Sequence, residues 1–381
     1  MKKRHLKSLP VLMHHLVSND ASHLSVRPAV FEEQCRSLAE KGWFGIGLAE
    51  AEEFLINGAP LPEKSFLMTF DDGFLDNYVY AWPIMRKYGH KGVIFAVSDR
   101  ISAEQRACEA HAQAGQSLLR PTIEDVWNSN CGKEDLPMID KLLHTGELGQ
   151  TVRRDLFLNW DEARLMEKSG VMAIAGHSTR HESVFAGPAF SDFVRPKDQL
   201  RTFCHTVPPS FWGLPDFDRV PELAHPAFIP APELAEEIKT LVPQDDAAAL
   251  AFFNSPAAVE KLQALVEKYK NNLGEFENPQ AQRLRFGEIM NRSQAVLSHE
   301  LGHKIRSFCW PWGVFCEEAR QAGLAAGFEV FYTTKLGINR PGAPLAVSRF
   351  KVKNRTDSWL LGRLRLYSRP LLGGLYLKMR L

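Results

Sequence analysis

The chain has 381 residues, and 45% of them are hydrophobic, which is enough to build the core of one large α/β domain or of two domains. A net charge of +1 excludes an overall electrostatic attraction to polyanions, so no nucleic-acid partner is expected. The six cysteines contain no C-x-x-C pair and no regular spacing, which argues against a zinc ribbon and a disulfide framework. A reducing compartment is therefore the expectation.

The start of the chain does not read as a secretion signal. A charged lead is followed by an apolar run that His14 and His15 interrupt, and no small-residue cleavage site follows. No stretch reaches the apolar length that a membrane-spanning helix needs. We therefore expect a cytoplasmic protein.

Strand-like and helix-like patterns alternate through the first part of the chain, which predicts a parallel sheet. The helix signals are clearest around Pro28, which stands in a first turn, and Gly42, which follows the last apolar position. The predicted strands are 10–17, 66–70 and 92–97, and the predicted helices are 27–43 and 76–88.

A buried strand ends in two adjacent carboxylates. The apolar run 66–70 leads directly into Asp71, Asp72 and Gly73. Two neighbouring carboxylates at the end of a buried strand repel each other and lose contact with solvent. A bound cation, or a proton on one of them, would reduce this repulsion. Because adjacent residues of an extended chain point in different directions, one Asp can bind a metal while the other accepts a proton from water. A plain acidic turn is the alternative.

Two histidines form a second candidate piece of a metal site. His177 and His181 follow the apolar run 171–175, which is a predicted strand preceded by a helix that Asn159 caps. Histidines four positions apart lie on one face of a helical turn. With one carboxylate they make a three-ligand set that leaves room for water on a divalent metal. A pair of surface histidines is the alternative.

A different metal motif occurs later in the chain. His299, Glu300 and His303 satisfy H-E-x-x-H, the helix motif of zinc proteases. The longer metzincin form fails, because Arg306 and Cys309 stand where its glycine and its third histidine belong. A zinc protease is therefore a less favoured alternative function.

Several of these stretches resemble one known family. Residues 69–73, 177–181 and 308–313 are similar to the first three motifs of the polysaccharide deacetylases, also called the NodB-homology group or carbohydrate esterase family 4. Residues 11–17 and 332–340 resemble the branch that includes the poly-N-acetylglucosamine deacetylases.

The resemblance implies an α/β fold, a distorted or incomplete (β/α) barrel of the NodB-homology type. The barrel is expected over residues 9–355, with insertions at 100–156 and 182–292. The second insertion is expected to have a loop half at 187–232 and a helical half, and to cover the substrate.

The resemblance also implies a reaction, the removal of an N-acetyl group from an amino sugar of a surface polysaccharide or of its lipid-linked or nucleotide-linked precursor. Asp72, His177 and His181 would hold a divalent metal, for which zinc is expected. Asp71 would act as the general base, and His15 would protonate the leaving amine.

The third motif contains the expected substrate contacts and differs from the family pattern at one position. Trp310, Pro311 and Trp312 would bind the sugar, and the main-chain N–H of Trp312 would stabilise the oxyanion. Cys309 stands where many family members have an arginine that orients the base, and the late Leu-x-x-His motif is missing. Cys309 keeps open a second alternative, a carbohydrate-binding protein whose catalytic site has decayed.

The tail 356–381 combines leucines with Lys and Arg, and lacks acidic residues after its first turn. Such a cationic amphipathic segment is suited to an anionic membrane surface. We therefore expect contact with the inner face of the membrane. Docking of the tail onto its own domain is the alternative, and Pro370 limits any helix to short pieces.

Overall fold

The computed structural model describes residues 5–19, 22–101, 119–137, 143–144, 156–196, 200–201, 206–207 and 211–379. Most of the expected insertion at 100–156 therefore lies outside the described residues.

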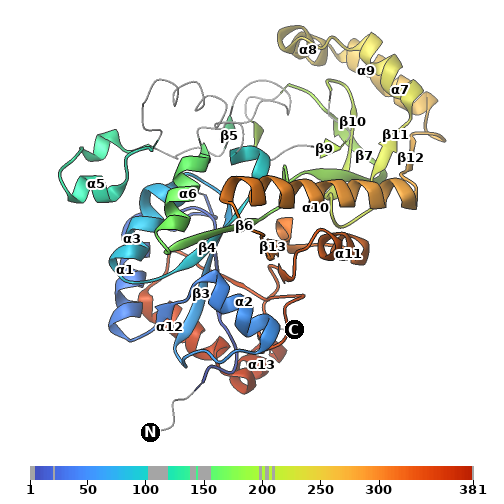
Figure 1. Ribbon diagram of the computed structural model, residues 1–381. Helices are drawn as coiled ribbons and strands as arrows, with labels where there is room; N and C mark the ends of the chain where they lie inside the picture. The colour runs from blue at the N-terminus through green and yellow to red at the C-terminus, as the bar shows by residue number, and fades with distance from the viewer. Residues whose placement is uncertain are drawn as a thin grey trace.

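The core of the molecule is a curled parallel sheet (Figure 1). Its strands are β1 (Val11–His14), β2 (Phe44–Gly45), β3 (Ser65–Asp72), β4 (Gly92–Ala96), β6 (Met172–Gly176), β13 (Ser307–Cys309), β14 (Val330–Tyr332) and β15 (Phe350–Lys351). The order is β14-β13-β6-β4-β3-β1-β15, with β2 paired to the start of β3. All of these pairs are parallel, as the alternating pattern predicts.

The sheet curls until its two edges approach each other. Val347, just before β15, forms a parallel bridge with Tyr332 of β14. In contrast, β13 and β6 pair at Phe308 and Gly176 alone, so the barrel is open between these two strands toward their N-terminal ends. The expected fold, a distorted (β/α) barrel, is confirmed.

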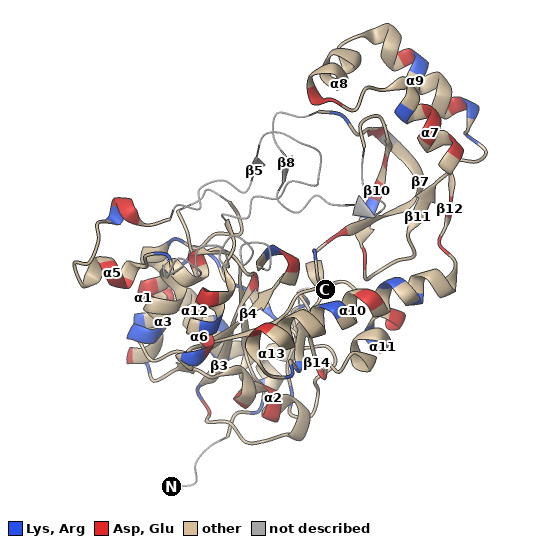
Figure 2. Cartoon of the chain, turned by 45° about the horizontal axis from the view of Figure 1, so that its top comes forward, with Lys and Arg blue, Asp and Glu red and all other residues tan. Residues whose placement is uncertain are grey.

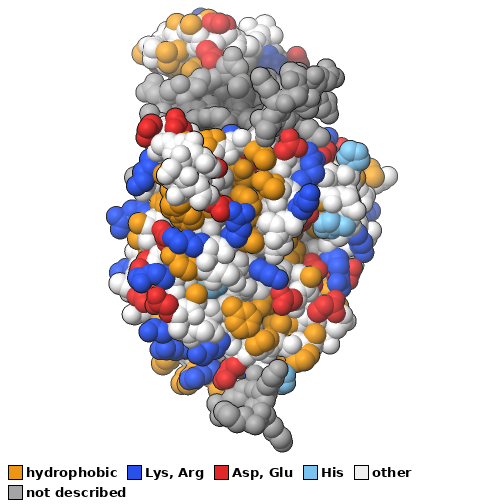
Figure 3. Space-filling view, turned by 60° about the vertical axis from the view of Figure 1, so that its left-hand side comes forward, with side chains coloured by type: hydrophobic (Ala, Val, Ile, Leu, Met, Phe, Trp, Pro, Cys, Tyr) orange, Lys and Arg blue, Asp and Glu red, His pale blue; other side chains and the backbone are white. Residues whose placement is uncertain are grey.

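Helices cover the outside of the barrel. They are α1 (Pro28–Glu40), α2 (Leu48–Asn57), the π-helix η1 (Asn77–Ala81), α3 (Trp82–Lys87), α6 (Trp160–Lys168), α10 (Pro279–Leu301) and α11 (Glu317–Ala325). The helix α5 (Ile123–Trp127) projects from the barrel (Figure 1), and the 3₁₀ turns η2 (Lys133–Asp135) and η4 (Pro311–Gly313) lie in connecting segments. The Asn159 cap of α6 is confirmed, because its side chain accepts from the Glu162 N–H at 2.9 Å. Over the face at the left of Figure 1, charges of both signs alternate with apolar side chains (Figure 3).

The second insertion forms a small satellite unit, seen at the upper right of Figure 1. It contains β7 (Ser183–Phe193), β9 (Thr206–Val207), β10 (Pro215–Pro221), β11 (Phe228–Pro230), α7 (Pro232–Leu241), α8 (Asp246–Phe253), α9 (Pro256–Lys268) and β12 (Gly274–Phe276). A short strand of the first insertion, β5 (Leu143–His144), pairs with β8 (Leu200–Arg201) of the second. The expected loop half is wrong, because β7 and β10 form an antiparallel pair there. The rings of Phe185, Phe217 and Phe228 pack together beneath it, which gives these strands a buried face.

The C-terminal tail forms two helices, α12 (Asp357–Tyr367) and α13 (Pro370–Lys378). In α12 the side chains of Leu360, Leu361 and Leu364 are buried in the main core. The expected membrane contact of the tail is therefore not supported for α12, because the apolar face of this helix is docked on the barrel. No described helix combines the length and the hydropathy that a transmembrane segment requires. In Figure 2 the positions of acidic and basic residues are spread over most elements of the chain.

Candidate active site

The candidate site lies where parallel strands end, because the C-terminal ends of such strands meet at one end of a barrel. β3 ends in Asp71 and Asp72, and the chain reaches His177 directly after β6. His15 directly follows β1, and the residues after β13 form the turn η4. The barrel therefore gathers residues that are far apart in the sequence.

Asp72, His177 and His181 are brought together with their ligand atoms within 4.8 Å of one another. All three side chains are buried. Asp72 Oδ1 lies 3.4 Å from His177 Nε2 and 3.7 Å from His181 Nε2. Burial opposes charge on Asp72, but the hydrogen bond from His177 and the nearby His181 hold the pKa of this carboxyl below its ordinary value.

The hydrogen bonding of His177 fits a cation at this place. Its Nδ1 lies 2.8 Å from the carbonyl oxygen of Cys309, which can only accept, so Nδ1 carries the proton. In the neutral ring, Nε2 then presents a lone pair toward the Asp72 carboxylate. A buried lone pair that faces a carboxylate is unfavourable, so this position suits either a metal cation or a proton on Nε2. Burial lowers the pKa of His177, but Cys309 and the hydrogen bond to Asp72 raise it above its ordinary value in the absence of a metal. The ligand set therefore fits a divalent metal.

The backbone places these ligands in a way that the sequence does not predict. The segment from His177 to His181 is an irregular turn, so the expected helical turn is wrong. Ser178 and His181 have φ of 62° and 57°, and the Ser178 hydroxyl accepts from the His181 N–H at 2.9 Å. Asp72 and Trp312 also have positive φ, so four of the five such non-glycine residues in the described chain lie at this site. Strain concentrated in this way is typical of functional sites.

Asp71 is held by an arginine that the motifs did not indicate. Arg349 donates from Nη1 and Nη2 to the two Asp71 oxygens, at 2.6 and 2.8 Å. Its guanidinium also contacts Thr69 Oγ1 at 3.0 Å, Cys309 Sγ at 2.9 Å and the Thr333 carbonyl at 2.9 Å. Burial alone would raise the pKa of Asp71, but Arg349 holds this pKa well below its usual range. Asp71 is therefore an oriented, ionised carboxylate.

The two N-terminal histidines have different environments. His15 Nε2 lies 3.9 Å from Asp71 Oδ2, and burial lowers the pKa of His15. His14 lies with its ring stacked on Phe70 at 5.0 Å and edge-on to Phe31 at 5.4 Å. Neither ring nitrogen of His14 has a hydrogen-bond partner among the described residues. His14 therefore acts as an aromatic packing residue.

The residues of the Trp-Pro-Trp turn lie partly in the core and partly at the candidate site. Trp310 is fully buried and stacks on Phe315 and Phe331, so the expectation that its ring contacts a sugar is wrong. Pro311 is also buried. Trp312 is 43% exposed, and its ring centre lies 4.0 Å from that of His181. Trp312 is therefore the residue of this turn that a ligand at the histidines would meet.

The rival H-E-x-x-H motif does not converge on a metal site. The side chain of His299 is 83% exposed, while Glu300 pairs with Arg164 at 2.9 Å and His303 with Glu167 at 3.1 Å. α10 ends at Leu301, with Gly302 left-handed after it, so His303 lies beyond the helix. These contacts argue against the zinc-protease alternative.

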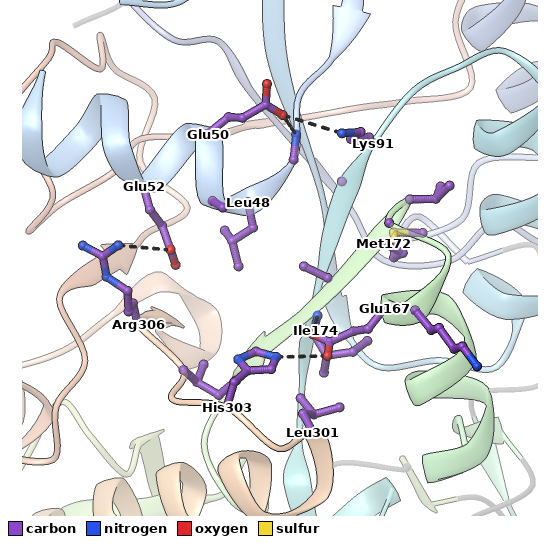
Figure 4. A pocket seen from close by; sticks show the side chains of 18 of the residues that line it. Leu48, Glu50, Glu52, Lys91, Glu167, Met172, Ile174, Leu301, His303 and Arg306 are labelled. Atoms are coloured by element: carbon purple, nitrogen blue, oxygen red, sulfur yellow. Dashed lines mark hydrogen bonds and ion pairs between the residues drawn. The ribbon is translucent and has the colours of Figure 1, made fainter. Parts of the chain in front are cut away.

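A cavity of about 830 Å³ lies at the opposite end of the sheet, beside the first residues of β4 and β6, where β6 and β13 diverge (Figure 4). His303 lies on its wall. Several of its charged side chains are paired with one another, as Arg306 with Glu52 and Lys91 with Glu50 show. This cavity is not part of the candidate site.

Part of this chain matches a known protein family in sequence. The model of the polysaccharide deacetylase family matches residues 58–207, a stretch that includes Asp71, Asp72, His177 and His181. This stretch of the chain is a polysaccharide deacetylase domain. The matched stretch does not reach His15, the Trp-Pro-Trp turn or Arg349.

Curated proteins share parts of this sequence. Polysaccharide deacetylase YxkH of Bacillus subtilis (strain 168) is 36% identical over 122 residues, which cover 31% of this chain and 43% of the relative. Poly-beta-1,6-N-acetyl-D-glucosamine N-deacetylase of Escherichia coli (strain K12) is 26% identical over 159 residues, 42% of this chain and 18% of the relative. The matches thus span less than half the length of these relatives.

Solved structures share the fold over almost the whole chain. A de-N-acetylase from Aggregatibacter actinomycetemcomitans superposes with a TM-score of 0.57 at 19% identity, covering 93% of this chain and 99% of that one. The BpsB deacetylase domain from Bordetella bronchiseptica gives 0.55 at 18% identity, with 92% and 98% covered. These similarities show a common barrel fold.

Arg349 is the site residue that sequence reasoning missed. From its position directly before β15, it replaces the arginine whose absence at Cys309 kept the decayed-site alternative open. One signal could have indicated it, since Arg349 stands between Val347 and Phe350 in a stretch expected to form a core strand. A charge in a buried strand needs a partner.

Proposed function

We propose that this polysaccharide deacetylase is a metal-dependent hydrolase that removes an N-acetyl group from an amino sugar. The amino sugar belongs to a surface polysaccharide or to its lipid-linked or nucleotide-linked precursor. The observation that carries this proposal is one buried cluster, in which a two-histidine, one-carboxylate ligand set adjoins a second carboxylate that an arginine orients.

Asp72, His177 and His181 would hold the divalent cation. Nitrogen and oxygen ligands of this number suit zinc, with remaining positions for water and substrate. Such a cation, when bound, polarises the acetyl carbonyl and lowers the pKa of water. Asp71 is not a ligand in this proposal, because both of its oxygens are engaged by Arg349.

Asp71 serves as the general base. It accepts a proton from the water whose oxygen attacks the acetyl carbon. Arg349 fixes the plane of the carboxylate and keeps it ionised at neutral pH. The main-chain N–H of Trp312 stabilises the oxyanion, and its exposed ring packs against the sugar.

His15 completes the reaction as the general acid. Because burial lowers its pKa, His15 is neutral before turnover. The proton that Asp71 takes from the water passes to His15 and then to the nitrogen as the C–N bond breaks. The products are acetate and the free amine.

The test is metal content, by mass spectrometry, together with acetate release from N-acetylglucosamine oligosaccharides. We compare the unmodified protein with Asp72→Ala and His177→Ala, and we use His303→Ala as a matched control from the rival motif. Loss of both metal and acetate in the first two variants, with both retained in the control, supports the proposal. Metal that persists in both variants but disappears in His303→Ala overturns it.

The cytoplasmic location stays a prediction. It bears on the substrate, because precursors carried on a lipid or a nucleotide are available on the cytoplasmic side of a membrane. Fractionation of cells that express the protein with its natural ends tests the location, and recovery outside the cytoplasm would contradict it.

A further inference from the structure

A second cavity, of about 470 Å³, lies beside the candidate active site, between the ends of β1 and β15 and helix α12. Its charged lining residues are all basic, and aromatic rings lie among them. The residues concerned are Lys351, Lys353, Arg355, Arg363, Trp359 and Tyr367.

The positive charge in this cleft is not neutralised. Within the described ranges of the chain, Lys351, Lys353 and Arg355 form no ion pair with a carboxylate. Arg363 instead lies over the Trp359 ring at 5.6 Å and contacts the Tyr376 hydroxyl. In the larger cavity at the other end of the sheet, by contrast, Arg306 contacts several glutamates. Lys353 and Arg355 are exposed and Lys351 is half-buried. Cations gathered along one cleft favour an anionic ligand.

The cleft adjoins the reactive centre through the backbone of β15. Lys351 is paired in register with Met13, two residues before His15. Arg349 directly precedes β15 and Lys351 ends it, so at the rise of an extended chain their Cα atoms lie about 7 Å apart. The first holds Asp71 and the second lines the cleft.

The opposite wall also connects the cleft to the site. Thr334 lines the cleft, and its hydroxyl donates to the carbonyl oxygen of Trp312 at 3.1 Å. The Trp312 ring in turn packs against His181. A ligand in the cleft would therefore lie next to the proposed sugar-binding position.

The side chains that line this cleft favour phosphate as the anionic ligand. Guanidinium groups bind phosphate through parallel hydrogen bonds, and ammonium groups add compact charge. Aromatic rings beside them can stack on a sugar or a base. We propose that this cleft binds the phosphate or diphosphate of a phosphorylated amino-sugar substrate whose acetamido group lies at Asp71. The proposal rests on the proposed deacetylase function and narrows its substrate to a sugar carried on phosphate.

Direct binding tests the cleft independently of turnover. The probes are N-acetylglucosamine 1-phosphate and N-acetylglucosamine, titrated calorimetrically into chelator-treated protein, because a metal would bind phosphate by itself. We expect the phosphorylated sugar to bind about tenfold or more tightly than the plain sugar. The double variant Lys353→Gln with Arg355→Gln should abolish this preference, whereas a matched control on the insertion, Lys261→Gln with Arg283→Gln, should keep it. Equal binding of the two sugars, or an unchanged preference in the double variant, overturns the proposal.

Turnover separates this proposal from the proposed function and identifies the carrier. Acetate release is measured from UDP-N-acetylglucosamine, from a polyprenyl diphosphate-linked N-acetylglucosamine and from tetra-N-acetylchitotetraose. The double variant should reduce kcat/KM on whichever phosphorylated compound is used by about tenfold more than on the oligosaccharide. An equal reduction on all three overturns the cleft assignment and leaves the deacetylase. Phosphate binding without acetate release from any of them supports the cleft and removes the proposed function.

Discussion

Arg349 and Asp71, 278 residues apart in the chain, form a two-point ion pair in the centre of the barrel. Both side chains are almost completely buried. A buried pair of this kind adds little to stability when it is intact, but removing one partner leaves an uncompensated charge. The pair therefore couples the geometry of the proposed base to the integrity of the barrel.

Replacing Arg349 should impair activity and shift its pH dependence. In Arg349→Met, burial acts on Asp71 without an opposing charge, so the pKa of Asp71 rises and the acidic limb of kcat/KM moves to higher pH. We expect a loss of activity on the order of 100-fold at neutral pH and a loss of unfolding free energy of about 3–5 kcal/mol. The measurements are pH–rate profiles and denaturant unfolding.

Arg349→Lys serves as the conservative variant. It keeps the charge but loses the bidentate contact, so it should retain more stability than Arg349→Met while losing activity. Arg365→Met, at an exposed position of α12, is the control for loss of a cation. An Arg349→Met protein with an unmoved acidic limb would show that Asp71 is not the base.

Exchanging the residues at positions 309 and 349 should preserve part of the activity. Cys309 Sγ lies 2.9 Å from Arg349 Nη2, so Cys309→Arg alone places two guanidinium groups in one buried space. That variant should unfold at lower denaturant concentration. The combination Cys309→Arg with Arg349→Cys should recover about tenfold or more of the activity that Arg349→Cys loses, because one arginine again adjoins Asp71. Additive losses in a double-mutant cycle would argue against this exchange.

His14 should limit stability in acid. Burial, and then the neighbouring His15, lower the pKa of His14 to about 3, so below its ordinary pKa the unfolded chain binds a proton that the folded chain does not. Stability is therefore lost as pH falls from about 6.5 toward that value, by about 1.4 kcal/mol per pH unit.

The variant His14→Phe removes this loss while keeping the ring contacts with Phe31 and Phe70. Unfolding free energies at neutral and acidic pH check the prediction. An acid-induced loss as large in the variant as in the unmodified protein would refute it.

Trp310 and Trp312 should respond to substitution in opposite ways. Trp310→Ala opens a cavity in the core and should cost about 3–5 kcal/mol of stability. Trp312→Ala removes an exposed ring beside His181, so stability should change little while KM for the sugar rises about tenfold. Thermal unfolding and steady-state kinetics distinguish the two effects. A Trp312 variant with unchanged kinetics would remove its ring from the substrate site.

The sequence by itself determined the barrel and the identity of its ligand-bearing motifs. Apolar runs that end in charged or imidazole side chains, as before Asp71 and before His177, are local patterns. Such patterns can be recognised without knowing which segments are neighbours in the fold. Alternation of strand and helix then places such strand ends at one end of a parallel sheet. The three proposed ligands are together for that reason.

The tertiary structure alone decided which residues support those motifs. The Arg349–Asp71 pair depends on β15 lying beside β1, and the bond from His177 to the Cys309 carbonyl depends on β13 lying beside β6. Trp310 and Trp312 stand two positions apart, yet the first is in the core and the second at the site, because the backbone turns between them. Long-range pairing and turn geometry depend on which segments meet in space, and a linear pattern carries little of that information.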